Sequence, residues 1–270
     1  MVSVGDWVTL DSSGDGDLRV IGLLPRRSKI SRQAPDDRGA EREHVLAANV
    51  DALLIVVAAR SPTVNARGLD RLLVLGEISG VPTEIALNKV DLWTAEGSPG
   101  EDPLAGRDRL GYRCHRISAS TGEGCAELAE ALRGRCTLLT GPSGVGKSTL
   151  VNRLVPGSDL RASAISAATG KGVHTTTQVD WIPFPGGGAL LDSPGLRGVQ
   201  PWGLDTATLA DCFTEMRGLE RCAFRDCSHR VEPNCAVRAA VQAGKIDFAR
   251  YDSYLRIRIE LEDLRGRGSR

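Results

Sequence analysis

The sequence predicts an α/β protein with a mostly parallel sheet at its centre, and three observations predict it. Apolar strand-like runs alternate with helical stretches between about residues 44 and 205. The segment "GPSGVGKST" (141–149) stands between an apolar run and a helical run. Short β-like runs precede this alternation, and helical sequence with clustered cysteines follows it. Because such alternation is typical of βαβ units, we expect an α/β core between a β-domain and a helical domain.

The bulk composition fits a soluble protein with a sizeable core. The 270 residues are 41% hydrophobic and 25% charged, and 34 Lys and Arg balance 34 Asp and Glu. The sequence has neither a signal-peptide pattern nor an apolar run of about 18 residues, so we expect a cytoplasmic protein that does not bind membranes. Since the net charge is zero, any nucleic-acid binding must depend on local patches.

The expected elements follow the chain in a simple order. "DWVTL" and "LRVIGLL" predict strands of a small β-domain, and the basic stretch "PRRSKISR" comes after them. "VDALLIVVAA" (50–59) is apolar throughout, which predicts a strand buried on both faces. Further strands are expected at 82–88, 112–118, 136–141, 178–184 and 188–193, and helices at 68–79, 123–134 and 147–155. The chain ends in a charged amphipathic helix, "FARYDSYLRIRIELEDLRG".

The segment after the strand "CTLLT" predicts a phosphate-binding P-loop. It has the pattern Gly-x4-Gly-Lys-Ser and leads directly into a helix. Glycines allow the backbone to wrap around phosphates, and the helix N-terminus favours an anion. We expect Lys147 to reach the β- and γ-phosphates and Ser148 to ligate Mg²⁺. The predicted loop residues are Gly141, Pro142, Ser143, Gly144, Val145, Gly146, Lys147, Ser148 and Thr149.

A second phosphate-side motif, "DSPG" (192–195), follows the strand-like "GALLD". Asp192 is the expected carboxylate partner of Mg²⁺, and the Gly195 N–H is expected near the γ-phosphate. Asp-x-x-Gly is a weak signal alone, because most such sequences are simple turns. Its position at a strand end downstream of the P-loop makes it specific.

Two motifs predict a guanine site, although both precede the P-loop. In "NKVD" (88–91), the Asp91 carboxylate can accept hydrogen bonds from the guanine ring N–H and exocyclic amine. Adenine lacks that donor pair and would leave the carboxylate unpaired. Asn88 is expected to support the loop and contact the base, and Lys89 to lie along the ring. "SAS" follows another strand, where the Ala119 N–H can meet the guanine carbonyl oxygen between Ser118 and Ser120.

The order of these motifs is base motif, SAS, P-loop and then DxxG. Taken alone, NKVD would be as well explained by an Asn-Lys turn, but the four motifs together predict a GTPase. The chain order is therefore circularly permuted, which is physically cheap when the termini of the original fold lie close together. A consequence is that DSPG leads straight into the C-terminal domain, so the nucleotide state can act on that domain directly.

Cysteine spacing in that C-terminal domain predicts a metal site. The chain has seven cysteines, and three of them cluster with a histidine as Cys222-x4-Cys227-x-His229-x5-Cys235. Three thiolates and an imidazole suit one tetrahedral, structural Zn²⁺. Because four protein ligands leave no open position, we expect no metal catalysis there. Cys212 does not fit the spacing and is interpreted as a core residue; the alternative for the whole cluster is reduced thiols in a helical domain.

These features together resemble the ribosome small-subunit-dependent GTPase A family (RsgA/YjeQ). The resemblance rests on the permuted order, "GPSGVGKST", "GKGVHTTT", "DSPG" and the Cys/His pattern, and it covers about residues 44–250. It implies an N-terminal OB-fold, a permuted GTPase core and a C-terminal zinc domain. We therefore expect a partial OB-fold-like domain at 1–43, the GTPase domain at 44–205 and the zinc-binding domain at 206–270. Members usually have more chain before "VGDWV", and 43 residues fall short of the roughly five strands of an OB-fold.

The resemblance also implies roles in the segment between the P-loop and DSPG. Thr176 in "HTTT" is the expected Thr ligand of Mg²⁺, beside Ser148 and Asp192, with Thr175 and Thr177 as less favoured choices. Leu196 follows DSPG, where many GTPases place a water-orienting Gln, and a hydrophobic side chain cannot orient water. His174 is the candidate for that role; the alternative is a solvated loop histidine. The predicted catalytic groups are thus His174, Lys147 and Thr176.

Two modest basic patches predict contact with RNA phosphates. Arg26, Arg27, Lys29 and Arg32 fall within seven positions, and residues 221–270 hold 11 Lys and Arg against 7 Asp and Glu. Such runs are usually solvated surfaces, but beside an OB-like domain and a zinc module they favour rRNA binding. The resemblance implies the 16S rRNA of the small (30S) ribosomal subunit as the partner.

The predicted function is GTP hydrolysis by a monomer. The resemblance implies that this protein acts late in assembly of the small ribosomal subunit, and we expect GTP hydrolysis to release it. Its ligands would be GTP or GDP with Mg²⁺. Two alternatives stay open at this point: a GTPase switch with a non-ribosomal protein partner, and an RNA-binding protein that holds nucleotide without hydrolysing it. Asp91 argues against an ATPase.

Overall fold

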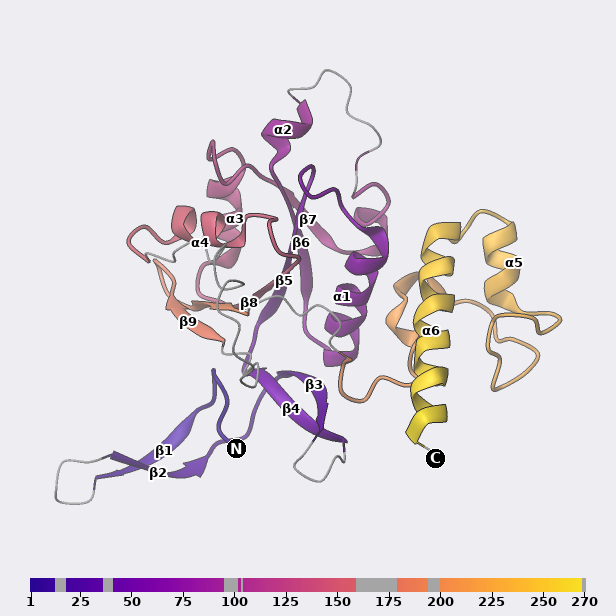
Figure 1. Ribbon diagram of the computed structural model, residues 1–270, viewed down its shortest axis with the longest axis horizontal. Coiled ribbons are helices and arrows are strands. Elements are labelled where there is room, and N and C mark those ends of the chain that lie inside the picture. The colour runs from indigo at the N-terminus through magenta and orange to yellow at the C-terminus, as the bar shows by residue number, and fades with distance from the viewer. Residues whose placement is uncertain are drawn as a thin grey trace.

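A computed structural model describes residues 1–12, 18–35, 41–94, 102, 104–158, 179–193 and 200–268. His174, Thr176 and Gly195 of the predicted site lie outside these residues, as do Thr175, Thr177 and Leu196. Figure 1 shows a central α/β domain with a β-hairpin projecting from one side and a helical module on the other. No helix among the described residues is long and apolar enough to span a bilayer.

The central domain is built on a six-stranded sheet. Its strand order is β7-β6-β5-β8-β10-β9, in which neighbours are parallel except for the antiparallel pair β10–β9. The strands are β5 (Ala52–Ala58), β6 (Thr83–Asn88), β7 (Arg113–Arg116), β8 (Cys136–Thr140), β9 (Asp180–Pro183) and β10 (Ala189–Asp192). Because five of them are parallel, their carboxyl ends meet at one edge of the sheet, which is where ligands bind in such folds.

Helices cover both faces of this sheet, as the sequence predicts. All seven residues of β5 are buried, since it is a central strand with a covered surface on each side. One face packs against α1, and the other packs against α3 and α4. The helices of this domain are α1 (Ala66–Ser79), α2 (Val90–Thr94), α3 (Cys125–Leu132) and α4 (Lys147–Leu154), with a 3-10 turn at Asp108–Leu110.

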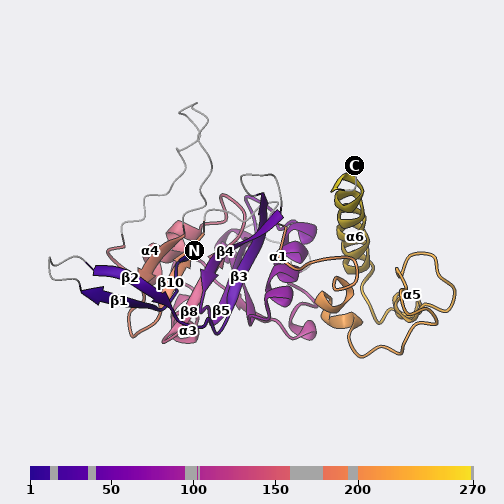
Figure 2. The same cartoon turned by 90° about the horizontal axis from the view of Figure 1, so that it is seen from below.

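The N-terminal β-region forms two antiparallel pairs. The first pair, called the N-terminal hairpin below, is β1 (Val8–Ser12) with β2 (Leu18–Leu23), and it projects away from the rest of the protein (Figures 1 and 2). The second is β3 (Lys29–Pro35) with β4 (Glu41–Ala48). It packs against the sheet through Ile30, which is fully buried.

The C-terminal module (206–268) is helical, in agreement with the predicted fold class. It contains 3-10 turns at Ala210–Cys212 and Thr214–Met216, then α5 (Ala236–Gln242) and α6 (Phe248–Gly268). Its apolar cluster includes Val74 from α1, so the module and the central domain share part of one core. The helix α6 runs beside α1, as both views show (Figures 1 and 2).

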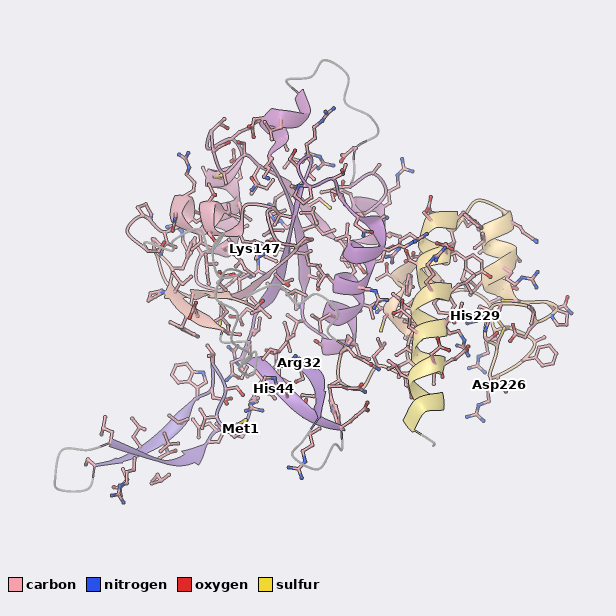
Figure 3. All side chains as sticks on the ribbon, in the orientation of Figure 1. Met1, Arg32, His44, Lys147, Asp226 and His229 are labelled. Atoms are coloured by element: carbon pink, nitrogen blue, oxygen red, sulfur yellow. The ribbon has the colours of Figure 1, made fainter. Side chains whose placement is uncertain are left out.

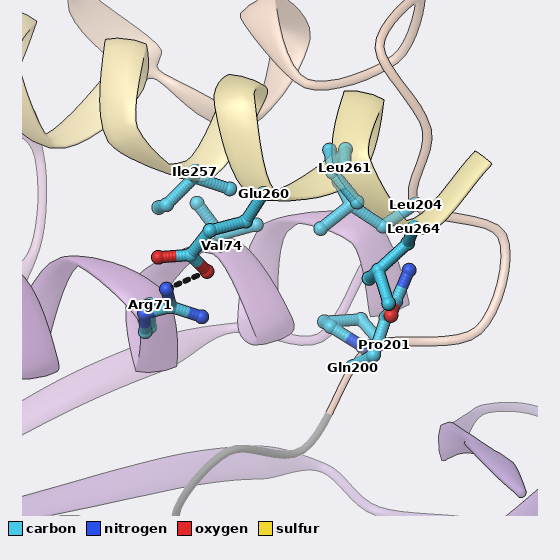
Figure 4. Close-up of a pocket in the computed structure, with 9 residues that line it drawn as sticks. All are labelled: Arg71, Val74, Gln200, Pro201, Leu204, Ile257, Glu260, Leu261 and Leu264. Atoms are coloured by element: carbon cyan, nitrogen blue, oxygen red, sulfur yellow. Dashed lines mark hydrogen bonds and ion pairs between the residues drawn. The ribbon is translucent and has the colours of Figure 1, made fainter. Parts of the chain in front are cut away.

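A cavity of about 220 Å³ lies between α1 and α6 (Figure 4). Val74, Leu204, Ile257 and Leu261 are among the apolar residues of its lining, and the Arg71–Glu260 ion pair lies beside them. It is bounded by the two packed helices and by the segment after Gln200, away from the carboxyl edge of the sheet. We therefore attribute it to imperfect packing at this junction.

Candidate nucleotide and metal sites

The predicted guanine and phosphate motifs come together at the carboxyl edge of the sheet. NKVD begins at the end of β6, SAS follows β7, the P-loop follows β8, and Asp192 ends β10. The parallel arrangement therefore places at one edge motifs that span more than a hundred residues of sequence. Chain order does not matter for this result, which explains how a permuted sequence can build the site.

Asn88 fastens three of these loops to one another. Its side chain is buried; Nδ2 donates to the carbonyl oxygen of Val145 in the P-loop (2.9 Å), and Oδ1 accepts from the Ala119 N–H (2.9 Å). The structure thus pairs the Ala119 N–H, which we expected to face guanine, with Asn88. Because both ends of the amide are used, Asn88 positions the base-side loops.

Lys89 and Asp91 extend from the same strand end. Lys89 has a left-handed backbone (φ 64°), and its Nζ donates to the carbonyl oxygens of Gly144 (2.7 Å) and Ser61. The contact with Ser61 could not be predicted from the sequence, because the acceptor is a backbone carbonyl, which every residue has. The Ser120 hydroxyl donates to Asp91 Oδ2 at 3.5 Å, which places this carboxylate beside the SAS loop.

The P-loop has the backbone that its glycines predict. Gly141, Gly144 and Gly146 all have positive φ. A Cβ at Gly141 would lie 2.1 Å from the Val56 carbonyl oxygen, so the loop approaches β5 too closely for any side chain. Lys147 Nζ donates to the carbonyl oxygens of Gly141 (2.8 Å) and Pro142 (3.1 Å). The lysine therefore lies along the loop that would surround the phosphates (Figure 3).

Asp192 has the properties expected of a magnesium partner. Its Oδ1 is buried and has no hydrogen-bond partner among the described residues, which leaves a buried acceptor available to a ligand. The pKa of Asp192 is raised above its ordinary value, mainly because the carboxyl group is buried. The positive charge of Lys147 opposes this shift, and the negative charge of Asp180 adds to it. The next residue, Ser193, is fully buried and donates to the Leu139 carbonyl oxygen (2.9 Å), which fixes the end of β10 against β8. The buried carboxylate of Asp192 therefore fits a role in holding Mg²⁺ together with a nucleotide.

The four predicted metal ligands lie together in the C-terminal module. One ligand atom from each of Cys222, Cys227, His229 and Cys235 lies within 4.8 Å of all the others. Cys222 Sγ lies 3.6 Å from His229 Nδ1 and 3.9 Å from Cys235 Sγ, and His229 Nδ1 lies 3.4 Å from Cys235 Sγ. Such separations are compatible with the corners of a tetrahedron around Zn²⁺.

Hydrogen bonds hold the loop that carries these ligands. The Tyr251 hydroxyl donates to the His229 carbonyl oxygen (2.6 Å), and the Tyr254 hydroxyl donates to the Ser228 carbonyl oxygen (3.2 Å). Both tyrosines come from α6, so the helix and the metal loop support each other. The cluster is remote from Lys147 (Figure 3), which agrees with a structural role.

The N-terminal basic stretch is largely paired with acidic groups. Arg26 binds Asp6, Arg27 approaches Asp51 (3.5 Å) and Lys29 binds Glu43 (2.7 Å). Arg32 Nε instead donates to His44 Nδ1 (3.3 Å), and both side chains lie at the β3–β4 pair (Figure 3). The sequence shows the positive charges, whereas their carboxylate partners appear only in the fold.

Comparison with known proteins agrees with this architecture. Residues 23–202 match the protein family described as "RsgA GTPase". Proteins named small ribosomal subunit biogenesis GTPase RsgA are similar along nearly the whole chain. That of Gemmatimonas aurantiaca is 44% identical, covering 96% of this chain and 84% of the relative. That of Chlorobaculum parvum is 40% identical, covering 97% and 86%.

Solved structures give the same result. The crystal structure of YjeQ from Thermotoga maritima matches with a TM-score of 0.73 and 30% identity, covering 97% of this chain and 84% of that one. YloQ, described as a circularly permuted GTPase, matches with a TM-score of 0.69 and 26% identity, covering 96% and 80%. The permuted order inferred from the motifs is therefore a property of the fold.

Proposed function

This chain belongs to the RsgA GTPase family, and from that premise we propose that it hydrolyses GTP and acts in biogenesis of the small ribosomal subunit. The observation that carries the proposal is the position of Asn88, whose amide binds both the P-loop and the SAS loop. That contact supports the proposal because it joins the loop predicted to read the base to the loop predicted to bind phosphate. The names of the relatives supply the ribosomal partner.

The proposed roles follow from the geometry of the carboxyl edge. Asp91 accepts hydrogen bonds from the guanine ring and its amine, with Asn88, Lys89 and the SAS loop (Ser118, Ala119 and Ser120) positioning the base. On phosphate binding, Lys147 exchanges its loop carbonyl partners for phosphate oxygens. The rest of the P-loop cradles the phosphates with its N–H groups.

The remaining roles are proposed for residues of which some lie in the described part of the chain and others lie outside it. Ser148, Asp192 and Thr176 are the proposed partners of Mg²⁺, and Gly195 the γ-phosphate contact. Bound Mg²⁺ would neutralise negative charge on the phosphates. His174 is the proposed group that orients the attacking water.

We further propose three units: a partial OB-like domain (1–43), a GTPase domain (44–205) and a zinc domain (206–270). The described β4 crosses the first of these boundaries. Cys222, Cys227, His229 and Cys235 would hold one structural Zn²⁺. The protein would act as a cytoplasmic monomer that contacts 16S rRNA, and GTP hydrolysis would time its release.

The test is GTP hydrolysis by the wild type and by His174→Ala, each with and without purified small ribosomal subunits. We expect subunits to stimulate the wild type, and the variant to bind GTP without stimulation. Stimulation of both proteins would keep the ribosomal role and refute the role of His174. GTP hydrolysis by the wild type that does not increase when subunits are added would refute the ribosomal role.

A further inference from the structure

Arg153 contacts the base-side loop from a helix that belongs to the phosphate site. It lies in the last turn of α4, and its Nε donates to the Ala119 carbonyl oxygen at 3.0 Å. Its Nη2 donates to the carbonyl oxygen of Ser120 at 2.5 Å. Gly122 has a φ of +97°, and a Cβ there would lie 3.5 Å from Nη1. The guanidinium group therefore lies in contact with the loop that follows Ala119.

These two bonds fix the direction in which the loop presents its donors. A trans peptide unit is planar, so its C=O and N–H point in opposite directions. When Arg153 holds the Ala119 carbonyl towards α4, the N–H of the same peptide unit, which belongs to Ser120, points away from α4. The adjacent Ala119 N–H meets Asn88, and the Ser120 hydroxyl meets Asp91. Arg153 therefore supports the loop from behind the surface that faces the base.

The contact also joins the two halves of the nucleotide site. The helix α4 begins at Lys147 and Ser148 of the P-loop and carries Arg153 six residues later. A guanidinium is suited to this position because it offers several donors in a fixed plane, and bonds from a charged donor are stronger than neutral ones. A cation in the last turn is also favoured by the helix dipole.

We propose that Arg153 is a positioning residue for guanine recognition, which holds loop 118–120 so that the Ser120 N–H meets the carbonyl oxygen of the base. Adenine carries an amine at that ring position, so a donor held there selects against it. The inference rests on the proposed guanine site and assigns a specificity role to a side chain that does not touch the base.

The test is competition of GDP, IDP and ADP with a fluorescent GDP analogue, using the full, zinc-loaded chain. In Arg153→Met, we expect GDP and IDP to bind about tenfold more weakly, because guanine and hypoxanthine both carry the carbonyl oxygen. The affinity for ADP should not change, because adenine lacks that oxygen. Asp91→Asn should weaken the binding of GDP more than the binding of IDP, since guanine has the exocyclic amine and hypoxanthine does not. Arg133→Met is the matched control, because Arg133 is exposed and its ion-pair partner among the described residues is Glu130 on α3 (2.9 Å).

The ratio of GDP to ADP affinity decides the outcome. An unchanged ratio in Arg153→Met, whether GDP binding is retained or both nucleotides weaken together, overturns the proposal. Arg153→Lys keeps the charge without the fork and should give an intermediate ratio, which provides a readout if the methionine variant does not fold. A wild type without guanine preference would refute the guanine site itself, which separates that failure from failure of Arg153.

Discussion

The two ends of the chain are attached to the central domain in opposite ways. The C-terminal module shares an apolar cluster with α1 and buries charged side chains at that junction. The N-terminal hairpin exposes apolar side chains on both strands, such as Leu10 at 47% and Val20 at 53%. Since burial of apolar surface drives folding, only the first attachment is strongly stabilised by it.

Ion pairs show the same contrast. Arg250 in α6 is 2% exposed; it donates to Asp70 of α1 (2.7 Å) and to both carboxylate oxygens of Glu215 (2.6 and 3.0 Å), and it lies 4.6 Å from the centroid of the Phe213 ring. The corresponding pair near the N-terminus, Arg26 with Asp6, joins two segments of the N-terminal region only. The C-terminal module is therefore held in a fixed position on α1, whereas the N-terminal hairpin is held by contacts within the N-terminal region.

The largest effect is expected from loss of the metal site, which should unfold the C-terminal module. In Cys222→Ser, we expect loss of zinc and unfolding of the C-terminal module, because structural zinc sites contribute on the order of 10 kcal/mol. GDP binding by the central domain should persist. Zinc content and hydrogen exchange of α5 and α6 would measure this.

A matched variant in the same module is Cys212→Ser, since Cys212 is buried but lies outside the ligand cluster. It should retain one equivalent of zinc. Protection of α5 and α6 that survives in Cys222→Ser would show that the module is stable without its metal.

Arg250→Met should have the next largest effect. It would leave the carboxylates of Asp70 and Glu215 buried without their main partner, and breaking a buried pair in this way costs about 3–5 kcal/mol. The control is Arg256→Met, because Arg256 pairs with Asp252 on the same helix but is half exposed, and we expect a change of about 0.5 kcal/mol or less. Denaturant unfolding would measure both, and equal losses would remove the distinction between the buried and exposed pairs.

The sequence predicts the α/β core, the site motifs and the metal ligands because each has a local signature. Apolar runs identify β5 and β6, glycine spacing identifies the P-loop, and cysteine spacing identifies the metal cluster. The Arg250 network could not be predicted in this way, because its partners Asp70 and Glu215 are distant in sequence and look like ordinary surface charges. Arg153 was missed for a similar reason, since its acceptors are backbone carbonyls.

Acid should weaken the N-terminal attachment through Asp6. The hydrogen bond from Arg26 lowers the pKa of Asp6, although burial opposes this, and the Ser3 N–H and the charge of Arg26 lower it further. A carboxyl group with a lowered pKa stabilises the fold above its ordinary value of 3.8, and this stabilisation is lost as the pH falls through the lower folded value.

Asp6→Asn should therefore cost about 1 kcal/mol at pH 7, and its difference from the wild type should shrink below about pH 4. Hydrogen exchange of β1 and β2 across this range would measure the difference. A gap that stays constant down to about pH 2 would show that the ion pair does not hold this region.

The smallest effect is expected for Val20→Thr in the N-terminal hairpin. Because Val20 is exposed, replacing a methyl group by a hydroxyl should change the free energy of unfolding by less than about 0.5 kcal/mol. The same substitution at Val57, which is 3% exposed in β5, buries a hydroxyl group and should cost about 1–3 kcal/mol. If thermal unfolding shows similar losses for both, the apolar surface of the hairpin is covered in solution, and the contrast between the two ends of the chain fails.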